Sequence, residues 1–311
     1  MYLFAGSSHP ALAQSLAREL GCTLGRVKLK AFSCGERYVR YEESIRGKDV
    51  YILQTGTGTP NEDLLELFLM CQAAKLSFAK SVHVLLPHFP YARQDRVAEP
   101  REPISAKLIA SLLERSGADH IITLDLHSEQ IQGFFRVPVD ALDGRPIFAE
   151  YLNAKKLKNP VIVAPDAGGA KRAKKLADLM NADLAIMHKN RVAHHQAEIL
   201  EVVGEIEGRT CILFDDIIDT AGTLLKAKEA LIKRGANKDV YAVATHPVFS
   251  GDAVKNLTKA GFKEIIVSDS MPIDRKTIRG LKVLTIAPML ATVIRHIESG
   301  ESVTEMYKRK K

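Results

Sequence analysis

Short apolar runs rich in β-branched residues alternate along the chain with longer segments in which apolar residues follow helical spacing. The first pattern predicts strands and the second predicts helices. Strands that alternate with helices are typical of βαβ units around a mostly parallel sheet, so the sequence predicts an α/β fold. The predicted strands are Tyr2–Ala5, Val50–Gln54, Val82–Pro87, His120–Leu124, Val161–Ala164, Leu184–Met187, Cys211–Phe214, Val240–Thr245, Glu264–Ser268 and Val283–Ile286.

The order of these elements occurs twice. The segment from Tyr2 resembles the segment from Val161 in strand, small-residue turn, helix and second strand. Further similar segments follow in the same order, starting at Asp49 and Thr210, at Ser81 and Asp239, and at Asp119 and Lys263. Any two βα segments look alike, but a series in the same order indicates duplication. We therefore predict two tandem domains, residues 1–147 and 148–311, with their boundary within residues 143–159.

The composition is consistent with two such domains, and the positions of the basic residues limit what the net charge implies about a partner. The 311 residues are 46% hydrophobic, enough for two cores. The net charge of +7 by itself favours a polyanionic partner such as nucleic acid, but four of the basic residues form the end of the chain, Lys308, Arg309, Lys310 and Lys311. A basic tail without interleaved aromatic residues is more typical of a solvated end. We expect no nucleic-acid partner.

The spacing of the cysteines and the lengths of the apolar runs indicate the cellular compartment of the protein. Cys22, Cys34, Cys71 and Cys211 lie far apart with no C-x-x-C pair, which favours neither a zinc site nor disulfides. No apolar run reaches the roughly 18 residues of a membrane span, and the first residues do not resemble a signal peptide. We expect a cytoplasmic protein without membrane association.

The segment TCILFDDIIDTAGT carries the most specific chemistry. The predicted strand Cys211–Phe214 ends in Asp215 and Asp216, and a small-residue loop then opens a helix that closes near Gly235. Backbone N–H groups and hydroxyls at a helix start converge on a phosphate, and small residues let it approach. We predict a monophosphate site at Asp219, Thr220, Ala221, Gly222 and Thr223. The paired acids would accept hydrogen bonds from sugar hydroxyls or hold a metal-bound ligand.

A plain helix cap is the alternative interpretation of this loop, since Asp219 and Thr220 are both common capping residues. A cap does not require two further acids at the strand end. The alternative is therefore weaker than the phosphate site, although it remains open at this stage.

Two other segments offer charged groups next to strands. In PDAGGAKR, Asp166 precedes two glycines and a helix start that contains Lys171 and Arg172, a combination suited to diphosphate and its magnesium. We expect the following lysines, Lys174 and Lys175, to form an ordinary solvated face. In HKNR, Lys189 and Arg191 follow a predicted strand, and taken alone they would be surface cations on a turn.

Together with PHFPYARQDR (residues 87–96) and DLHSEQIQGFF (residues 125–135), these segments resemble the ribose-phosphate diphosphokinases, or phosphoribosyl diphosphate synthetases. FDDIIDTAGT resembles the sugar-phosphate motif of the type I phosphoribosyltransferase fold. The resemblance runs in order from about Gly6 to Tyr307. It implies two tandem domains of that fold, and it implies transfer of the diphosphoryl group of ATP to the 1-hydroxyl of ribose 5-phosphate for nucleotide biosynthesis.

The resemblance also implies roles for individual residues. Lys189 would stabilise the transition state, and Arg191 would bind the transferred phosphates and the sugar phosphate. Phe32 would stack on adenine. Further ATP contacts and a Mg²⁺ site would come from Cys34, Gly35, Glu36, Arg93 and Gln94 for ATP, and from His127 and Asp166 for the metal. The family further implies a homohexamer in which the ATP site is shared between subunits.

The sequence departs from the family at several positions. Cys34 stands where the family usually has Asp or Asn, and a thiol is a weak partner for a purine. Residues 97–105 are less basic than in many members, so regulation by phosphate or ADP is not carried over. Asn190 replaces a residue that is often Arg or Glu. The first copy's LQTGTGTPNEDLL lacks the paired acids, so we expect only the second copy to bind the sugar phosphate.

Two other functions remain as alternatives. A non-catalytic regulatory subunit of a synthetase would keep the fold but lose catalytic positions, whereas Lys189, Arg191 and Asp166 are present. A phosphoribosyltransferase that consumes the product would share FDDIIDTAGT, but it would not need the duplicated domain with the PYARQD and DLHSEQ segments.

Overall fold

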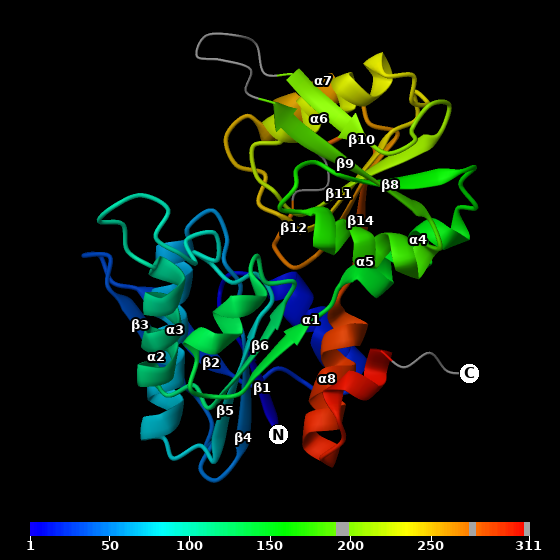
Figure 1. The fold of residues 1–311 in the computed structure, drawn as a ribbon. Coiled ribbons are helices and arrows are strands. Elements are labelled where there is room, and N and C mark those ends of the chain that lie inside the picture. Colours follow the sequence, from blue (N-terminus) through cyan, green and yellow to red (C-terminus); the bar gives the residue numbers. More distant parts are fainter. Residues whose placement is uncertain (191–198, 274–277, 308–311) are drawn as a thin grey trace. The chain divides into compact units, whose positions relative to one another are not determined.

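The computed structural model describes residues 1–190, 199–273 and 278–307. The chain forms two compact units (Figure 1). The first contains Met1–Leu142, Ser270–Pro272 and Thr285–Lys311, and the second contains Asp143–Asp269 and Ile273–Leu284.

The first unit is built on a five-stranded sheet whose strands are all parallel, in the order β1-β4-β5-β6-β7. A separate antiparallel hairpin, β2 with β3, lies between α1 and β4 in the chain. The strands are β1 (Tyr2–Ala5), β2 (Val27–Ala31), β3 (Arg37–Tyr41), β4 (Asp49–Leu53), β5 (Ser81–Leu86), β6 (His120–Leu124) and β7 (Val139–Leu142). The helices are α1 (Pro10–Leu20), α2 (Pro60–Leu76), α3 (Ser105–Ser116), α8 (Ala287–Ser299), and the short 3₁₀ helices η1 (Glu129–Phe134) and η2 (Val303–Tyr307).

The second unit contains a seven-stranded sheet in the order β10-β9-β8-β11-β12-β13-β14, parallel except for the edge strand β10. Its strands are β8 (Pro160–Ala164), β9 (Asp183–Asn190), β10 (Ile199–Val203), β11 (Thr210–Ile218), β12 (Tyr241–Pro247), β13 (Glu264–Ser268) and β14 (Leu281–Leu284). Its helices are α4 (Arg145–Ala154), α5 (Ala170–Met180), α6 (Gly222–Lys233) and α7 (Ala253–Ala260).

The sheet orders confirm the predicted duplication. The order β1-β4-β5-β6-β7 of the first unit corresponds strand by strand to β8-β11-β12-β13-β14 of the second. The sequence comparison had paired the first four of these strands with their counterparts, but it had not paired β7 with β14. The units differ in the hairpin that follows the first helix. In the second unit β9 joins the main sheet beside β8, whereas in the first unit β2 pairs with β3 alone.

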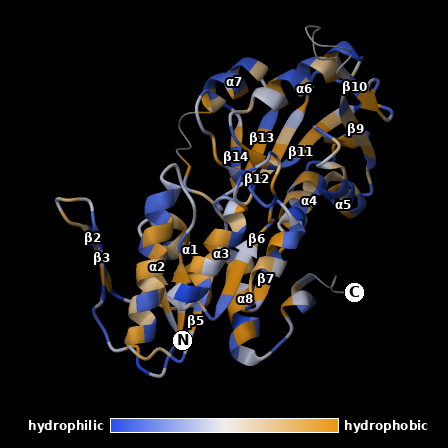
Figure 2. Cartoon of the chain, turned by 60° about the vertical axis from the view of Figure 1, so that its left-hand side comes forward, coloured by the Kyte–Doolittle hydropathy of each residue, from blue (hydrophilic) through white to orange (hydrophobic). Residues whose placement is uncertain are grey.

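Both faces of the second sheet are buried, as expected for parallel strands covered by helices. Val163 and Leu213 pack on one face with Leu224 of α6, while Ile162 and Ile212 pack on the other with residues of α4 and α5. Figure 2 shows that the strands of both units are mostly apolar. Among the described residues, no helix combines the length and the apolar character needed to span a membrane.

The last helix changes the predicted domain limits. The first unit ends at Leu142 and the second begins at Asp143, but residues 285–311 belong to the first unit again. The sequence had placed residues 148–311 in one domain. Helix α8 contacts α1, and the Tyr51 hydroxyl of β4 donates to Glu298 Oε1 of α8 at 2.9 Å. An apolar helix face identifies a buried surface but does not say which sheet it covers, so the repeat pattern could not reveal this return.

Helix α8 provides a test of this division. Leu290 is 1% exposed, and Leu290→Ala should lower the free energy of unfolding by about 2–5 kcal/mol because it leaves a cavity. Hydrogen exchange should show the loss of protection first in β1 and β4. Gln14→Ala, on an exposed position of α1, is the control. Loss of protection that begins in β11 and β12 would contradict the division.

Candidate active site

The carboxyl edge of the second sheet gathers the charged residues found in the sequence. Strand β8 lies between β9 and β11, with Val163 opposite Leu213 and Ala164 opposite Ile186. Asp166 and Asp216 each lie three residues beyond the first of these pairs, so the two residues reach the same level of the edge. Ligands of open α/β sheets bind at this edge.

The acid pair lies within a strand and not after its end. Strand β11 continues to Ile218 by pairing with β12, four residues beyond the predicted end, so Asp215 and Asp216 are part of it. Asp216 is 3% exposed. Arg172 Nη2 of α5 lies 2.8 Å from Asp216 Oδ1 and 3.4 Å from Asp215 Oδ1. The sequence placed Arg172 among the diphosphate-binding cations, but here its guanidinium joins α5 to the acid pair.

Burial and the neighbouring carboxyl group of Asp216 determine the direction in which the pKa of Asp215 is shifted. Burial raises the pKa of Asp215 well above its usual range, and the hydrogen bond and charge of Asp216 raise it further. Arg172 acts in the opposite direction. A carboxyl group held in this way offers oxygens to hydroxyl donors, which suits a sugar better than an anion.

The predicted phosphate loop has an open helix start. The N-cap of α6 is Ala221, in the left-handed conformation with φ 60°, and among the described residues no side-chain cap bond is formed at this position. Asp219 and Thr220 both precede Ala221, so neither of them is the N-cap residue of α6. The first N–H groups of a helix have no partner within it, so those from Gly222 onward are available to an anion at this start.

Two residues that the sequence did not identify hold this loop. Ser250 Oγ donates a hydrogen bond to Asp219 Oδ1, and Asn256 Nδ2 donates one to the Thr220 carbonyl at 2.8 Å. Ser250 follows β12, the strand beside β11. The rule that loops of neighbouring parallel strands meet at one edge could have indicated Ser250, whereas Asn256 lies on α7 and left no sequence signal.

In the loop after β8, the carboxylate of Asp166 bonds to the backbone at the start of the next helix. Asp166 is exposed, and its Oδ1 accepts the Gly169 N–H at 2.8 Å at the start of α5. An exposed carboxylate beside a helix start fits Mg²⁺, which binds through one or two carboxylates together with phosphate oxygens. Lys174 pairs with Asp178 on the exposed side of α5, in agreement with the solvated face expected there.

The predicted catalytic cations lie at or beyond the end of the described β9. The backbone of Lys189 belongs to β9, three residues beyond Ile186, and therefore reaches the same edge as Asp166. Asn190 pairs with Ile199, so β9 and β10 form a hairpin. Arg191 lies outside the described residues.

The predicted nucleotide residues belong to the first unit. Phe32, Cys34, Gly35 and Glu36 form the tip of the β2–β3 hairpin, where the exposed Phe32 ring lies edge-on to Tyr38 with centroids 5.7 Å apart. The other ATP residues, Arg93 and Gln94, lie exposed in the loop after β5, and Gln94 Oε1 accepts a hydrogen bond from Ser105 Oγ.

The two predicted metal residues lie in different units. His127, half-buried, follows β6 in the first unit, and Asp166 belongs to the second. Among the described residues, no three His, Cys, Asp or Glu side chains gather as a metal site. The carboxylate of Asp166 is an oxygen donor of the kind that Mg²⁺ prefers, whereas His127, an imidazole, remains a prediction from the resemblance.

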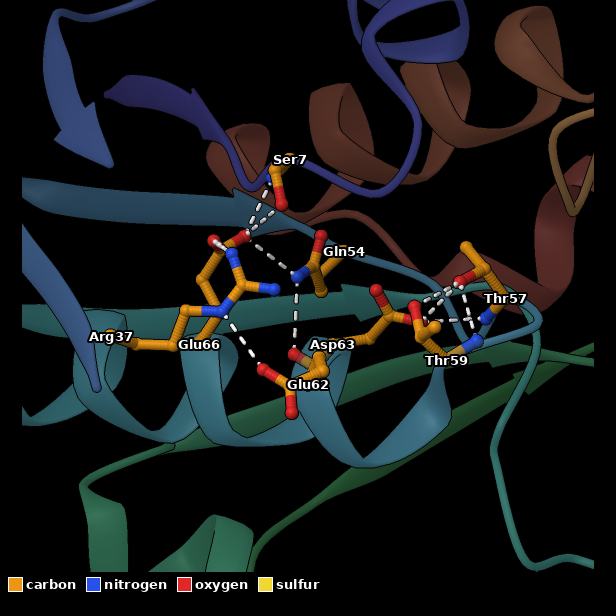
Figure 3. Close-up of polar contacts among 8 residues, drawn as sticks. All are labelled: Ser7, Arg37, Gln54, Thr57, Thr59, Glu62, Asp63 and Glu66. Carbon is orange, nitrogen blue, oxygen red and sulfur yellow. Dashed lines mark hydrogen bonds and ion pairs between the residues drawn. The ribbon is translucent and has the colours of Figure 1, made fainter. Parts of the chain in front are cut away.

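In the corresponding loop of the first unit, a carboxylate of the following helix accepts the hydrogen bonds that the loop donates. Thr57 N and Thr57 Oγ1 donate to Asp63 Oδ2 at 2.8 and 2.6 Å, in the loop that matches the phosphate loop of the second unit (Figure 3). Gln54 donates to Glu66 Oε1 at 3.0 Å at the same edge. An anion at this loop would compete with Asp63 for the N–H and hydroxyl of Thr57, which gives a physical reason to expect the sugar phosphate in the second unit alone.

Comparisons with known proteins identify the family of the chain. A family model described as the N-terminal domain of ribose phosphate pyrophosphokinase matches residues 1–117, and one described as a phosphoribosyl synthetase-associated domain matches residues 189–308. The ribose-phosphate pyrophosphokinase of Bacillus subtilis is 46% identical over 306 residues, 98% of this chain and 96% of the relative. The chain belongs to the ribose-phosphate pyrophosphokinase family.

Other members agree over the same length. The ribose-phosphate pyrophosphokinase of Oceanobacillus iheyensis is 44% identical over 306 residues, 98% of this chain and 96% of the relative. The crystal structure of phosphoribosylpyrophosphate synthetase from Mycobacterium smegmatis is 42% identical, with a TM-score of 0.91 over 96% of this chain and 99% of that one. The fold of this family member is thus two phosphoribosyltransferase-like domains.

The raised pKa of Asp215 makes stability depend on pH. The folded state holds the Asp215 proton more tightly than the unfolded chain, whose Asp pKa is about 3.9, so burial of the charged form costs stability above that pH. Asp215→Asn should raise the urea midpoint at neutral pH, and this gain should disappear on acidification below pH about 4.

Asp178→Asn is the matched control for this prediction, since Asp178 is an exposed acid on α5. It should leave stability within about 0.5 kcal/mol of the unchanged protein. A midpoint for Asp215→Asn that is lower at neutral pH than that of the unchanged chain would show that burial does not dominate at this site.

Proposed function

We propose that this chain transfers the diphosphoryl group of ATP to the 1-hydroxyl of ribose 5-phosphate, giving 5-phosphoribosyl 1-diphosphate and AMP for nucleotide biosynthesis. The observation that carries the proposal is the uncapped start of α6 beside the acid pair of β11, in a member of the ribose-phosphate pyrophosphokinase family. An anion site next to carboxylates that accept hydrogen bonds from hydroxyl groups suits a sugar phosphate.

The 5-phosphate would bind the loop at Asp219–Thr223. The N–H groups at the start of α6 and the hydroxyls of Thr220 and Thr223 supply donors to its oxygens. The sugar hydroxyls would donate to Asp215 and Asp216, whose repulsion of the phosphate is reduced by Arg172. The bonds from Ser250 and Asn256 keep the loop in place for this purpose.

Diphosphoryl transfer is an in-line displacement at phosphorus. The 1-hydroxyl oxygen bonds to the β-phosphorus, the bond from that phosphorus to the oxygen bridging it to the α-phosphorus breaks, AMP leaves, and the hydroxyl proton is released. Catalysis consists mainly of positioning and of neutralising oxygen charge. We assign Lys189 and Arg191 to this charge, and the position of the Lys189 backbone at the carboxyl edge supports the assignment.

Magnesium is the metal proposed for the reaction, with Asp166 and His127 as the residues that would hold it. When bound to the diphosphate, it supplies positive charge to the phosphate oxygens. The exposed Asp166 carboxylate next to the α5 start supports its part in this.

The nucleotide would be recognised by residues of the first unit, namely Phe32, Cys34, Gly35, Glu36, Arg93 and Gln94. The exposed Phe32 ring at a hairpin tip supports a role in stacking on adenine. We further propose a homohexamer in which a neighbouring copy completes the ATP site, and a cytoplasmic location.

The regulatory-subunit alternative has one observation in its favour, the description of the family model that matches residues 189–308 as a synthetase-associated domain. Full-length relatives, however, are named pyrophosphokinases, and Lys189, Arg191 and Asp166 are all present. Activity of the purified chain separates the two possibilities.

The deciding experiment incubates the purified full chain with ATP, ribose 5-phosphate and Mg²⁺, and identifies the nucleotide product by chromatography. We expect AMP in equal amount to 5-phosphoribosyl 1-diphosphate. ADP would indicate transfer of a single phosphoryl group and would contradict the proposal. Absence of turnover at every phosphate concentration would favour the regulatory subunit.

A second experiment concerns Lys189. Loss of one cation from a phosphoryl-transfer site should lower kcat by about 10²–10³-fold, so Lys189→Ala should show this loss with an unchanged unfolding midpoint. Lys174→Ala removes a lysine from the exposed side of α5 and should keep full activity. Equal activity of both variants would remove Lys189 from the catalytic assignment.

A further inference from the structure

The β2–β3 hairpin carries the proposed nucleotide residues on an independent support. It forms a two-stranded sheet that, among the described residues, joins neither main sheet, and it stands out beside α2 (Figure 2). A two-stranded hairpin is marginally stable alone, so contacts with other elements must fix its position. These contacts occur at two places along its length.

The base of the hairpin is held by an aromatic residue. Tyr41, which pairs with Val27, lies edge-on to Phe4 with ring centroids 4.6 Å apart. Its hydroxyl donates to the Met70 carbonyl of α2 at 3.0 Å. These contacts fix the end of the hairpin that is distant from the nucleotide residues.

The tip of the hairpin is held by Arg37. Arg37 pairs with Ala31 at the last rung of the ladder and directly follows Glu36. Its Nε lies 3.1 Å from Glu62 Oε2, and its Nη1 lies 3.6 Å from Glu66 Oε2, both on α2. The tip itself is closed by Phe32 N donating to the Glu36 carbonyl at 2.8 Å, so it follows Arg37 as a unit.

Glu66 extends this contact to the carboxyl edge of the first sheet. Its side chain is 2% exposed, and its Oε1 accepts bonds from Ser7 N at 2.7 Å and from Gln54 Nε2 at 3.0 Å (Figure 3). Ser7 and Gln54 follow the neighbouring strands β1 and β4. A buried carboxylate needs a compensating charge, and Arg37 supplies one.

We propose that Arg37 is a positioning residue for nucleotide recognition, which fixes the loop at residues 32–36 to α2 and, through Glu66, to the carboxyl edge of the first sheet. The inference rests on the proposed function, because it takes residues 32–36 as the adenine site. Arg37 acts on that loop and not on the sugar-phosphate residues, which belong to the second unit. Its removal should therefore weaken the nucleotide and leave the sugar unaffected.

The test compares Arg37→Met with Arg40→Met. Arg40 lies on the same strand, is 61% exposed at its side chain and pairs at 3.7 Å with Glu42, so it is a matched control. In Arg37→Met we expect the KM for ATP to rise about tenfold, which corresponds to about 1.4 kcal/mol, with unchanged kcat and unchanged KM for ribose 5-phosphate. Arg40→Met should change none of these.

The variant Arg37→Lys distinguishes a loss of positioning from a folding defect. It retains the charge but loses the two-pronged contact with Glu62 and Glu66, so its KM for ATP should lie between those of the unchanged chain and Arg37→Met. An unchanged KM for ATP in Arg37→Met would overturn the inference. A parallel rise in both KM values with a lower unfolding midpoint would also overturn it, since that result indicates a structural role alone.

Calorimetric titration with ATP separates this inference from the proposed function. Weaker ATP binding by Arg37→Met than by Arg40→Met supports the positioning role even if the chain makes no AMP. Equal ATP binding by both variants overturns the positioning role even if the chain is fully active.

Discussion

The parallel pairing of β8 with β9 and β11 is the constraint on which the candidate site depends. Parallel strands in register bring their following loops to one edge, and here that edge receives Asp166, the acid pair and the backbone of Lys189 from three separate segments. The site then needs a cation to hold two adjacent carboxylates, of which Asp216 is buried, and Arg172 of α5 provides it. The start of α5 is therefore tied to β11 by electrostatics as well as by apolar packing.

The two copies of the fold treat the same loop in opposite ways. In the second unit the bonds that stabilise the loop come from outside it, through Ser250 and Asn256. In the first unit the loop hydroxyl and N–H of Thr57 are satisfied by Asp63, four residues into α2. The loop of the first unit is therefore stabilised by its own following helix, whereas the loop of the second unit is stabilised by residues outside that helix.

The hairpins show a similar divergence. The tip at residues 32–36 and the segment between β9 and β10 occupy the same place in the order of elements of the two copies. One hairpin remains part of the main sheet, while the other has left it and depends on Tyr41 and Arg37 for support. The element that follows the first helix is therefore built differently in the two units.

The sequence by itself determined the fold class and the duplication, because the apolar periodicity and the matching segments are local patterns, whereas the order of the strands in each sheet came from the structure. It also determined which residues are chemically special, since FDDIIDTAGT and PDAGGAKR combine acids, small residues and helix starts in short stretches. The tertiary structure alone decided that β11 extends through the acids, that Arg172 bridges them, that Ser250 and Asn256 hold the phosphate loop, and that α8 returns to the first unit. Each of these features depends on contacts between residues far apart in the chain, and no local pattern in the sequence records such contacts.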